Sequence, residues 1–553
     1  MADPLTQVLE PSAHVDTFCR DALPPLELWP RMIFSGVPEL AYPLRLNCVA
    51  ELLDARIAAG DGERTAILFP EGRWSYRELH AAVNRIAHVL VEDLGLVPGN
   101  RVLLRGPNTP LLAACWLAVA KAGGVVVCTM PMLRVRELTY IADKAQIRLA
   151  ITDARIAAEC EQAMRTKADG SPREGARLVH FQGDGGEGSL EALMRNKPGD
   201  FAACDTAADD VALILFTSGT TGQAKGTLHF HRDALAVSDC FPRYVLKPTA
   251  DDIFCGSPSL AFAYGIGGLL FFPLRFGASV LLLEQSSPAV LLQGIQDHRA
   301  TICFTVPTAY RAMLALTGDF DLTSLRRCVS AGETLPAATF EAWRNATGIE
   351  IIDGIGSTEM LHQFISTSDG DILPGSTGKA IPGYEAKVVD DNGEEVPPGV
   401  IGRLAVIGPT GCRYLADPER QQQYVQNGWN LTGDAYLRDA DGHFWYQART
   451  DDMIVSAGHN IAGPEVESVL LHHPKVRECG VVGVPDEVRG QIVKAFVVLN
   501  PGAEPSVGTI MELQEHVKLH IAPYKYPRKV EFVDSLPRTE TGKLQRFKLR
   551  QGG

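Results

Sequence analysis

The sequence predicts an α/β fold in which a large N-terminal domain of β-sheets covered by helices precedes a small α+β domain at the C-terminus. The 553 residues exceed what one hydrophobic core holds, at about 100–200 residues per domain. From about residue 48 onward, apolar residues alternate between helical and strand periods, which is typical of parallel strands covered by helices. The pattern changes at Arg449–Asp452, so we predict the domains to be residues 1–449 and 450–553.

The N-terminal domain shows its elements in a clear order. Residues 1–45 are rich in proline and irregular, and we expect them to wrap the main body. Ser75–Glu78 has the S-x-x-E form of a capping box, and apolar residues at helical spacing follow it, so a helix begins there. Arg101–Leu104 and Val125–Cys128 are predicted strands, and the apolar Leu111–Lys121 between them is a predicted buried helix.

The elements after residue 200 follow the same logic. Val211–Phe216 consists of six apolar residues in a row, as in a strand that is buried on both faces. Asp390–Gly393, with the sequence Asp-Asp-Asn-Gly, predicts a hairpin turn. In the C-terminal domain we predict two helices and two strands, over Pro464–Leu470, Gly480–Val484, Val493–Leu499 and Leu513–Leu519.

Charge and composition exclude several classes of protein. The hydrophobic content of 46% and charged content of 21% are those of an ordinary globular chain. The net charge of −14 argues against a nucleic-acid-binding surface, which needs a basic patch. Single cations and backbone loops can still bind anionic ligands inside an acidic protein.

Neither a membrane span nor a secretory signal is evident. The longest apolar stretches, Leu111–Ala120 and Ile266–Leu274, have about half of the ~20 residues that cross a bilayer, so we expect buried helices or strands. Met1–Arg20 lacks the apolar run of a signal peptide. The twelve cysteines form no C-x-x-C pair, which favours buried thiols in a reducing compartment. We expect a cytoplasmic protein without membrane or nucleic-acid partners; its oligomeric state stays open, with a homodimer as the candidate.

A loop rich in glycine and hydroxyl groups, Thr217–Gly226, directly follows the buried strand. Small residues let backbone N–H groups converge on a phosphate, and Lys225 adds a positive charge. The spacing is not that of a Walker A loop, because Gly226 rather than Ser or Thr follows the lysine. We interpret the loop as a phosphate-binding loop.

This loop resembles the phosphate loop of the acyl-adenylate-forming superfamily, which includes acyl-CoA synthetases, peptide-synthetase adenylation domains and luciferases. Further segments agree in order and spacing, so the resemblance runs from about residue 50 to the C-terminus. It implies the acyl-adenylate-forming enzyme fold, ATP and CoA as substrates, and Mg²⁺ as the metal ion. The segments are Ser330–Pro336, Asp353–Glu359, Trp429–Asp434, Arg449–Asp452 and Pro537–Lys543.

The resemblance assigns roles to individual residues. Thr358 would contact the α-phosphate, Glu359 would hold Mg²⁺, and Asp434 and Arg449 would bind the ribose. A carboxylate suits both tasks, because Mg²⁺ prefers oxygen ligands and a diol donates two hydrogen bonds. The implied ATP-binding and AMP-binding residues are Thr217, Ser218, Gly219, Thr220, Thr221, Gly222, Lys225, Gly332, Glu333, Asp353, Gly354, Ile355, Gly356, Ser357, Thr358, Asp434, Arg449 and Lys543.

The C-terminal domain supplies the mobile part of the implied mechanism. Lys543 matches the catalytic lysine, where an ammonium can balance charge that develops on phosphorus. Asp451 would be the hinge between two domain positions, and Gly458 would line the CoA tunnel, where a thin ligand passes close to backbone. This chain departs from the usual Pro, aromatic, Gly and Gly of the superfamily at Ala224, Ile355, Ala448 and Ala457, respectively.

The acid pocket looks closer to the benzoate–CoA ligase branch than to fatty-acid or acetate enzymes. The resemblance places Phe262, Ala263, Tyr264 and Gly265 in the pocket, together with His362 and Gln363. Core packing explains the aromatic residues equally well on sequence alone. Gln363 stands where benzoate ligases commonly have an apolar residue. A buried amide needs a hydrogen-bond partner, and an amino or hydroxyl group on the ring of the acid could supply one. The stretch His14–Leu53 also resembles 2-aminobenzoate–CoA ligases, so we expect 2-aminobenzoate (anthranilate), with benzoate or a hydroxybenzoate next.

The implied reaction is ATP-dependent ligation of an aromatic acid to CoA through acyl-AMP, with release of AMP and pyrophosphate. Three alternatives stay open at this point. The enzyme could load a carrier-protein thiol, or the chain could be a catalytically inactive ligand sensor, although the residues expected for catalysis are present. An NAD-binding oxidoreductase fits only the β/α alternation, since no convincing G-x-G-x-x-G follows a strand.

Overall fold

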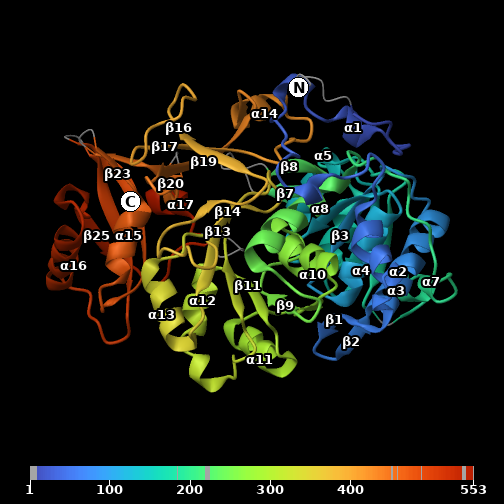
Figure 1. The fold of residues 1–553 in the computed structure, drawn as a ribbon, viewed down its shortest axis with the longest axis horizontal. Helices are drawn as coiled ribbons and strands as arrows, with labels where there is room; N and C mark the ends of the chain where they lie inside the picture. Colours follow the sequence, from blue (N-terminus) through green and yellow to red (C-terminus); the bar gives the residue numbers. More distant parts are fainter. Residues whose placement is uncertain are drawn as a thin grey trace.

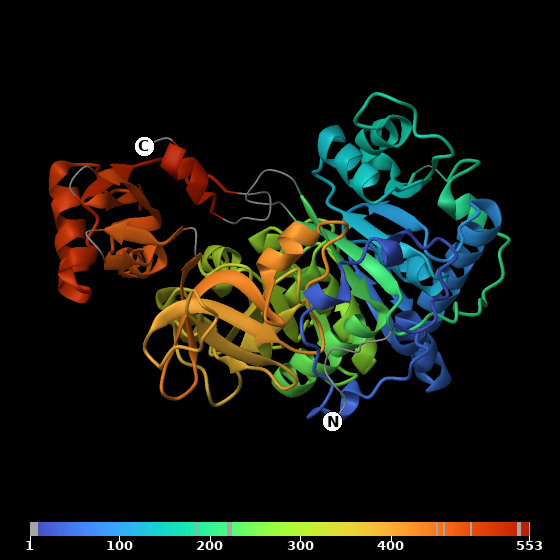
Figure 2. The same cartoon turned by 90° about the horizontal axis from the view of Figure 1, so that it is seen from above.

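The structure is a computed structural model that describes residues 9–183, 185–217, 224–449, 452–456, 459–486, 489–538 and 544–551. A large body of three sheets with their helices carries the residues up to Arg449 (Figure 1). A smaller group of strands and helices from residue 454 onward stands at one side of this body (Figure 2). The predicted α/β fold with a large N-terminal and a small C-terminal domain is confirmed.

A six-stranded sheet forms the first layer of the large body, and it is mostly parallel. The helix after Ser75 begins as predicted, because the Ser75 and Glu78 side chains form a capping box. In sheet order the strands are β6 (Arg177–Phe181), β5 (Leu149–Asp153), β3 (Arg101–Arg105), β4 (Val125–Thr129), β7 (Val211–Thr217) and β8 (Lys225–Phe230). The helices around it are α2 (Ala55–Ala58), α3 (Tyr76–His88), α4 (Pro110–Lys121), α5 (Val135–Lys144), α6 (Ala158–Arg165), α7 (Leu190–Met194) and α8 (His231–Phe241).

A nine-stranded sheet forms the second layer, with a parallel centre and antiparallel strands at both ends. In sheet order its strands are β15 (Lys379–Ala380), β14 (Gln363–Ser366), β13 (Ile351–Gly356), β12 (Arg327–Ser330), β11 (Ile302–Thr305), β9 (Ile253–Gly256), β10 (Ser279–Leu281), β1 (Thr65–Phe69) and β2 (Gly72–Ser75). Its helices are α9 (Ala263–Ile266), α10 (Phe272–Phe276), α11 (Pro288–His298), α12 (Pro307–Met313) and α13 (Ala337–Thr347). The apolar stretch Ile266–Leu274 is buried helix, with a π-helical segment between α9 and α10.

The third sheet is antiparallel, and the sequence indicated only its hairpin turn. That turn, Asp390–Gly393, follows β16 as predicted. The sheet contains β16 (Glu385–Val389), β17 (Ile401–Ile407), β18 (Val425–Gln426), β19 (Trp429–Arg438) and β20 (Phe444–Arg449), with α14 (Pro418–Tyr424) beside it. The C-terminal domain has β21 (Ile454–Ser456), β22 (His459–Ile461), β23 (Val476–Asp486), β24 (Gly490–Leu499) and β25 (Lys529–Phe532), with α15 (Gly463–Leu471), α16 (Val507–His520) and α17 (Arg546–Gln551).

The N-terminal segment lies against the large body, as expected. Described residues from Leu9 onward include the short helix α1 (Phe18–Asp21), and Arg101 forms an ion pair with Asp16. All twelve cysteines are free thiols, and all except Cys204 are buried. Within the described ranges, no helix has both the length and the apolar character needed to cross a bilayer. The domain boundary at residue 449 stays a prediction, since residues 450 and 451 lie outside the described ranges.

Candidate functional site

The predicted site segments meet where parallel strands end. Ser330–Pro336 follows β12, Asp353–Glu359 runs out of β13, and the loop after Thr217 follows β7. Ligands of open α/β sheets bind outside the carboxyl ends of the strands, so this placement suits a binding site. The sequence could indicate each segment, whereas the tertiary structure brings them together: β12 and β13 are neighbours in the nine-stranded sheet, and β7 belongs to the six-stranded sheet.

The predicted phosphate loop connects β7 and β8, which pair as an antiparallel hairpin. Thr217, the last residue of β7, lies opposite Lys225, the first residue of β8. The Tyr140 hydroxyl donates a hydrogen bond to the backbone oxygen of Ala224, 3.0 Å away, which anchors the returning strand. Of the predicted contacts in the loop itself, Ser218, Gly219, Thr220, Thr221 and Gly222 lie outside the described residues.

Lys225 and Glu359 come together although 134 positions separate them in the sequence. The Lys225 Nζ lies 3.8 Å from the Glu359 Oε1, and the Glu359 side chain is largely buried. Tyr414 joins the two, because its hydroxyl donates to the Glu359 Oε1 at 2.6 Å and lies 3.4 Å from the Lys225 Nζ. Burial and then the Glu359 charge raise the pKa of Tyr414, so this hydroxyl stays a donor.

The oxygen atoms of Glu359 and its neighbours are suitable ligands for a magnesium ion. A carboxylate stands beside the hydroxyl-bearing Ser357 and Thr358, and these are oxygen ligands of the kind that Mg²⁺ prefers. Across the described residues, no group of three or more His, Cys, Asp or Glu is placed to hold a metal ion. Binding through one carboxylate together with substrate phosphates is the usual arrangement for this ion.

Asp434 and Arg449, the predicted ribose contacts, lie opposite each other on β19 and β20. The Arg449 Nη1 is 3.1 Å from the Asp434 Oδ1 and donates to the backbone oxygen of Thr432 at 2.9 Å. Gly433 is needed for this arrangement, because a Cβ there would lie 2.6 Å from the Arg449 Nη2. The pairing fixes the carboxylate at a point where a diol can donate to it.

The predicted adenine side is built by the loop after β12 and by β13. Gly332 has a φ of 89°, in the left-handed region that favours glycine. Glu333 lies 3.7 Å from Arg538 of the C-terminal domain, measured from Oε1 to Nη1. Burial raises the pKa of Asp353 to about 8, although the Ser330 hydroxyl and the Gly354 N–H oppose the shift.

The predicted acid pocket is an aromatic cluster around His362. The ring centroids of Phe272, Phe241, Tyr264 and Phe304 lie 4.6, 5.5, 5.7 and 6.4 Å from that of His362, respectively. Burial lowers the pKa of His362 to about 3, so the ring is neutral.

Glycines make room for this cluster. A Cβ on Gly267 would lie 2.4 Å from the His362 Cδ2, and a Cβ on Gly265 would lie 2.0 Å from the backbone oxygen of Ser259. Ala263 is buried next to them, and Phe262 precedes α9 as its N-cap. Of the predicted pocket residues, Tyr264 and His362 are therefore close neighbours, and the glycine at position 267 leaves room for the His362 ring.

Gln363 directly follows His362 and is buried, and its amide has a defined orientation. The Nε2 lies 3.4 Å from the backbone oxygen of Ser330, which can only accept a hydrogen bond. The Oε1 is therefore the free end of the amide, and it has no hydrogen-bond partner among the described residues. A Cβ on Gly354 would lie 2.3 Å from the Nε2, so glycine there admits the glutamine.

Three predicted residues of the C-terminal domain, Asp451, Gly458 and Lys543, lie outside the described residues. The described residues Arg538 and Leu544 form an antiparallel bridge with each other. Arg538 also lies beside Glu333, in the loop that follows β12.

Sequence reasoning missed several residues of the site. Tyr414 contacts Glu359, His229 contacts the backbone of Thr358, and Gly267 accommodates His362. No local pattern marks Tyr414 or Gly267, because the residue that each contacts is 50 or more positions away. The histidines of the Gly226–His231 stretch were the only signal, since a polar ring inside an apolar strand needs a partner.

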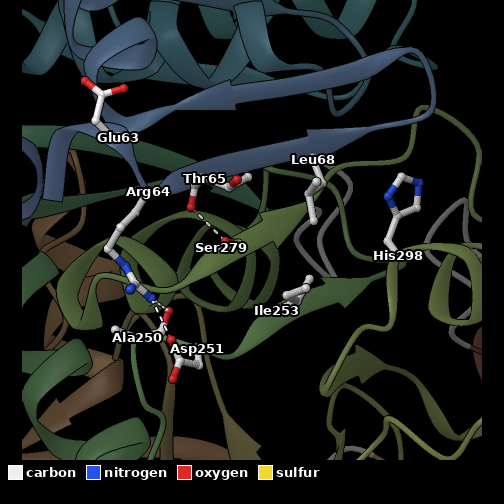
Figure 3. Close-up of a pocket in the computed structure, with 9 residues that line it drawn as sticks. All are labelled: Glu63, Arg64, Thr65, Leu68, Ala250, Asp251, Ile253, Ser279 and His298. Carbon is white, nitrogen blue, oxygen red and sulfur yellow. Dashed lines mark hydrogen bonds and ion pairs between the residues drawn. The ribbon is translucent and has the colours of Figure 1, made fainter.

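A depression lies at the amino-terminal ends of β1, β9 and β10, whereas the predicted site segments follow the carboxyl ends of their strands (Figure 3). Its volume is about 520 Å³, and it is wide open. Figure 3 shows Arg64 turned toward Asp251, at 2.9 Å, and the Ser279 hydroxyl donates to the Thr65 backbone at 2.7 Å. None of the predicted site residues lines it.

Comparison with known proteins decides the family. Residues 55–414 match the model of the AMP-binding enzyme family, and residues 465–543 match the model of the AMP-binding enzyme C-terminal domain. The chain belongs to the AMP-binding enzyme family. Benzoate–CoA ligase of Thauera aromatica is 37% identical over 522 residues, which cover 93% of this chain and 97% of that protein.

Solved structures of AMP-binding enzymes agree with this assignment. An anthranilate CoA ligase in complex with anthranoyl-AMP superposes with a TM-score of 0.87 at 35% identity, covering 93% of this chain and 98% of that one. A benzoate CoA ligase from Burkholderia xenovorans LB400 gives a TM-score of 0.83 at 33% identity, covering 91% and 100%. This AMP-binding enzyme is an acid–thiol ligase of the acyl-CoA synthetase group, in the benzoate–CoA ligase-like branch.

Proposed function

We propose that this AMP-binding enzyme joins 2-aminobenzoate to CoA through 2-aminobenzoyl-AMP, with ATP consumed and AMP and pyrophosphate released. The buried Oε1 of Gln363 carries the proposal, because it is an acceptor without a hydrogen-bond partner among the described residues, on the residue that directly follows His362. The ring amino group of 2-aminobenzoate is such a donor, and benzoate has none. The similarity to an anthranilate CoA ligase supports the same acid.

In the first half-reaction, a carboxylate oxygen of the acid attacks the α-phosphorus of ATP, and the bond to the pyrophosphate oxygen breaks. Lys225 and the loop before it would hold the pyrophosphate side, and Thr358 would contact the α-phosphate. Lys543 would place its ammonium between the carboxylate and the α-phosphate, where it stabilises the developing charge. A bound Mg²⁺ would neutralise phosphate charge, and Glu359 would hold it.

In the second half-reaction, the thiolate of CoA attacks the acyl carbon, and AMP leaves with the oxygen that came from the carboxylate. Gly458 would line the path of the CoA arm, and Asp451 would be the hinge on which the small domain turns between the two steps. Asp434 and Arg449 would keep hold of the ribose of AMP in both half-reactions.

The domain limits at residues 449 and 450, the cytoplasmic location and the homodimer remain predictions.

Benzoate is the second candidate, followed by a hydroxybenzoate. The neutral His362 ring and the four aromatic side chains around it suit any flat ring, and a benzoate–CoA ligase is a strong match over most of the chain. A separate carrier protein as acceptor also stays open, since the two thiols have the same reactive arm.

The test is release of AMP, with CoA present, for 2-aminobenzoate, benzoate, 4-hydroxybenzoate and a medium-chain acid. We expect the highest kcat/KM for 2-aminobenzoate and almost no activity with the medium-chain acid. A higher kcat/KM for benzoate than for 2-aminobenzoate would overturn the choice of acid. Replacement of CoA by a phosphopantetheinylated carrier protein tests the acceptor.

A further inference from the structure

The turn that carries Thr358 and Glu359 is strained. Its backbone folds back on itself, with the N–H of Leu361 donating to the Thr358 oxygen at 3.2 Å. Leu361 has a φ of 66°, in the left-handed region, which costs an ordinary residue about 1–2 kcal/mol. Such a conformation persists only where the surrounding structure holds it in place.

Two buried side chains hold the turn at its carbonyl groups. The His229 Nε2 donates to the Thr358 oxygen at 2.8 Å, and the Thr410 hydroxyl donates to the Met360 oxygen at 2.8 Å. Because a backbone oxygen only accepts, His229 carries a proton on Nε2. His229 extends from β8, the strand that begins at Lys225, and alternate residues of a strand share a face. One strand therefore supplies both the cation near Glu359 and the support for Thr358.

A buried ion pair stands behind His229. The His229 Nδ1 lies 3.8 Å from the Asp233 Oδ2, and the Arg413 Nη1 lies 2.9 Å from the same oxygen. All three side chains are fully buried. Burial raises the pKa of Asp233, but Arg413 and His229 outweigh it and lower this pKa to about 2, so the carboxylate is charged.

Stability alone is a poor explanation for these groups. A buried ion pair loses hydration energy that its attraction only partly returns, and apolar residues of similar volume are often as stable. What the pair provides is a defined geometry. Asp233 is fixed by Arg413 and by the backbone N–H of Phe230, at 3.0 Å, and Arg413 stacks on the Phe230 ring with 4.0 Å between guanidinium carbon and centroid.

We propose that Arg413, Asp233 and His229 form a positioning network that fixes the Thr358 carbonyl and thereby aims Thr358 and Glu359 at the phosphates of ATP. The inference rests on the proposed adenylation. Arg413 is followed by Tyr414, which contacts Glu359, so a single short segment supports both residues of the turn. His229, Asp233 and Arg413 act through the turn and touch no substrate.

The test compares His229→Ala with His231→Ala. His231 is equally buried and two positions away, but its Nδ1 accepts the backbone N–H of Cys48 at 3.1 Å, which is remote from the turn. For His229→Ala we expect kcat of acid-dependent ATP–pyrophosphate exchange to fall about 100-fold, the scale of a misplacement of about 1 Å. KM for the acid should change little, and His229→Gln, which keeps an N–H donor, should recover part of the loss.

Hydrogen exchange of the 357–361 amides gives a readout that needs no substrate. Exchange should accelerate in His229→Ala and stay as in the parent chain in His231→Ala. Equal loss of kcat in both alanine variants, in step with Tm, would refute the network, and so would unchanged kinetics and exchange in His229→Ala. If the parent chain adenylates no aryl acid, the proposed function fails, while the exchange data and MgATP binding still decide the network.

Discussion

Replacement of Gln363 by methionine tests the choice of acid most directly. Methionine has nearly the same length and volume, so the aromatic cluster around His362 should keep its packing. The change removes the Oε1 that lacks a partner and the Nε2 that lies 3.4 Å from the Ser330 oxygen. It therefore deletes the acceptor for a ring amino group and should leave the aromatic cluster in place.

The expected change in kcat/KM follows from the energy of one hydrogen bond. Loss of a neutral hydrogen bond to 2-aminobenzoate costs about 0.5–1.5 kcal/mol, or about 2-fold to 13-fold in kcat/KM. Benzoate should be little affected in the same variant, because it carries no donor for the Gln363 oxygen, which is already buried and has no partner among the described residues. The ratio of the two kcat/KM values should therefore shift about 2-fold to 13-fold toward benzoate.

The assay is initial-rate AMP release with each acid, at saturating MgATP and CoA, alongside Tm. Benzoate serves as the internal control, since a general loss of fold or of ATP binding lowers both rates alike. A ratio that stays within about twofold of the parent value would refute the reasoning. A shift toward 2-aminobenzoate would show that the amide repels the amino group.

Three other predictions follow from single residues. Lys543→Ala should abolish adenylation but leave thioester formation from supplied acyl-AMP nearly intact, as rapid-quench assays of each half-reaction would show; equal loss in both contradicts the role. The folded-state pKa of Asp353, raised to about 8 from an ordinary 3.8, means that the folded chain keeps a proton that the unfolded chain loses, so stability falls as pH rises through this window. Asp353→Asn should therefore raise Tm, and the gain should grow from pH 4 to pH 8. Expressed as free energy of unfolding, the gain should increase by about 1.4 kcal/mol per pH unit at most. A Tm difference that does not change with pH argues against the raised pKa. Gly267→Ala places a Cβ 2.4 Å from the His362 Cδ2, and it should lower the free energy of unfolding by about 1–3 kcal/mol and raise KM for the acid. The control Gly318→Ala, whose Cβ would have nothing within 4 Å, should change neither quantity. Chemical denaturation measures the stability of both variants, and AMP release measures KM.

Local patterns in the sequence predicted local structure well. The capping box at Ser75 starts α3, and the apolar run Val211–Phe216 is a buried strand, because both signals arise within a few residues. The antiparallel sheet of β16–β20 was missed apart from its turn. Its strands alternate weakly between apolar and polar residues, and their pairing depends on partners far along the chain.

From the sequence alone, this protein could be assigned to the acid–thiol ligases of the AMP-binding enzyme family, and the segments expected to bind nucleotide could be predicted. These segments are continuous, so residue type and spacing are enough to mark them. The sequence analysis did not predict how these segments are supported, which depends on the tertiary structure. His229 and Arg413 reach Thr358 and Asp233 across 129 and 180 positions, and Gln363 is oriented by an oxygen of another strand. Such contacts exist only once the strands have paired, since hydrogen bonds and burial depend on distance in space rather than along the chain.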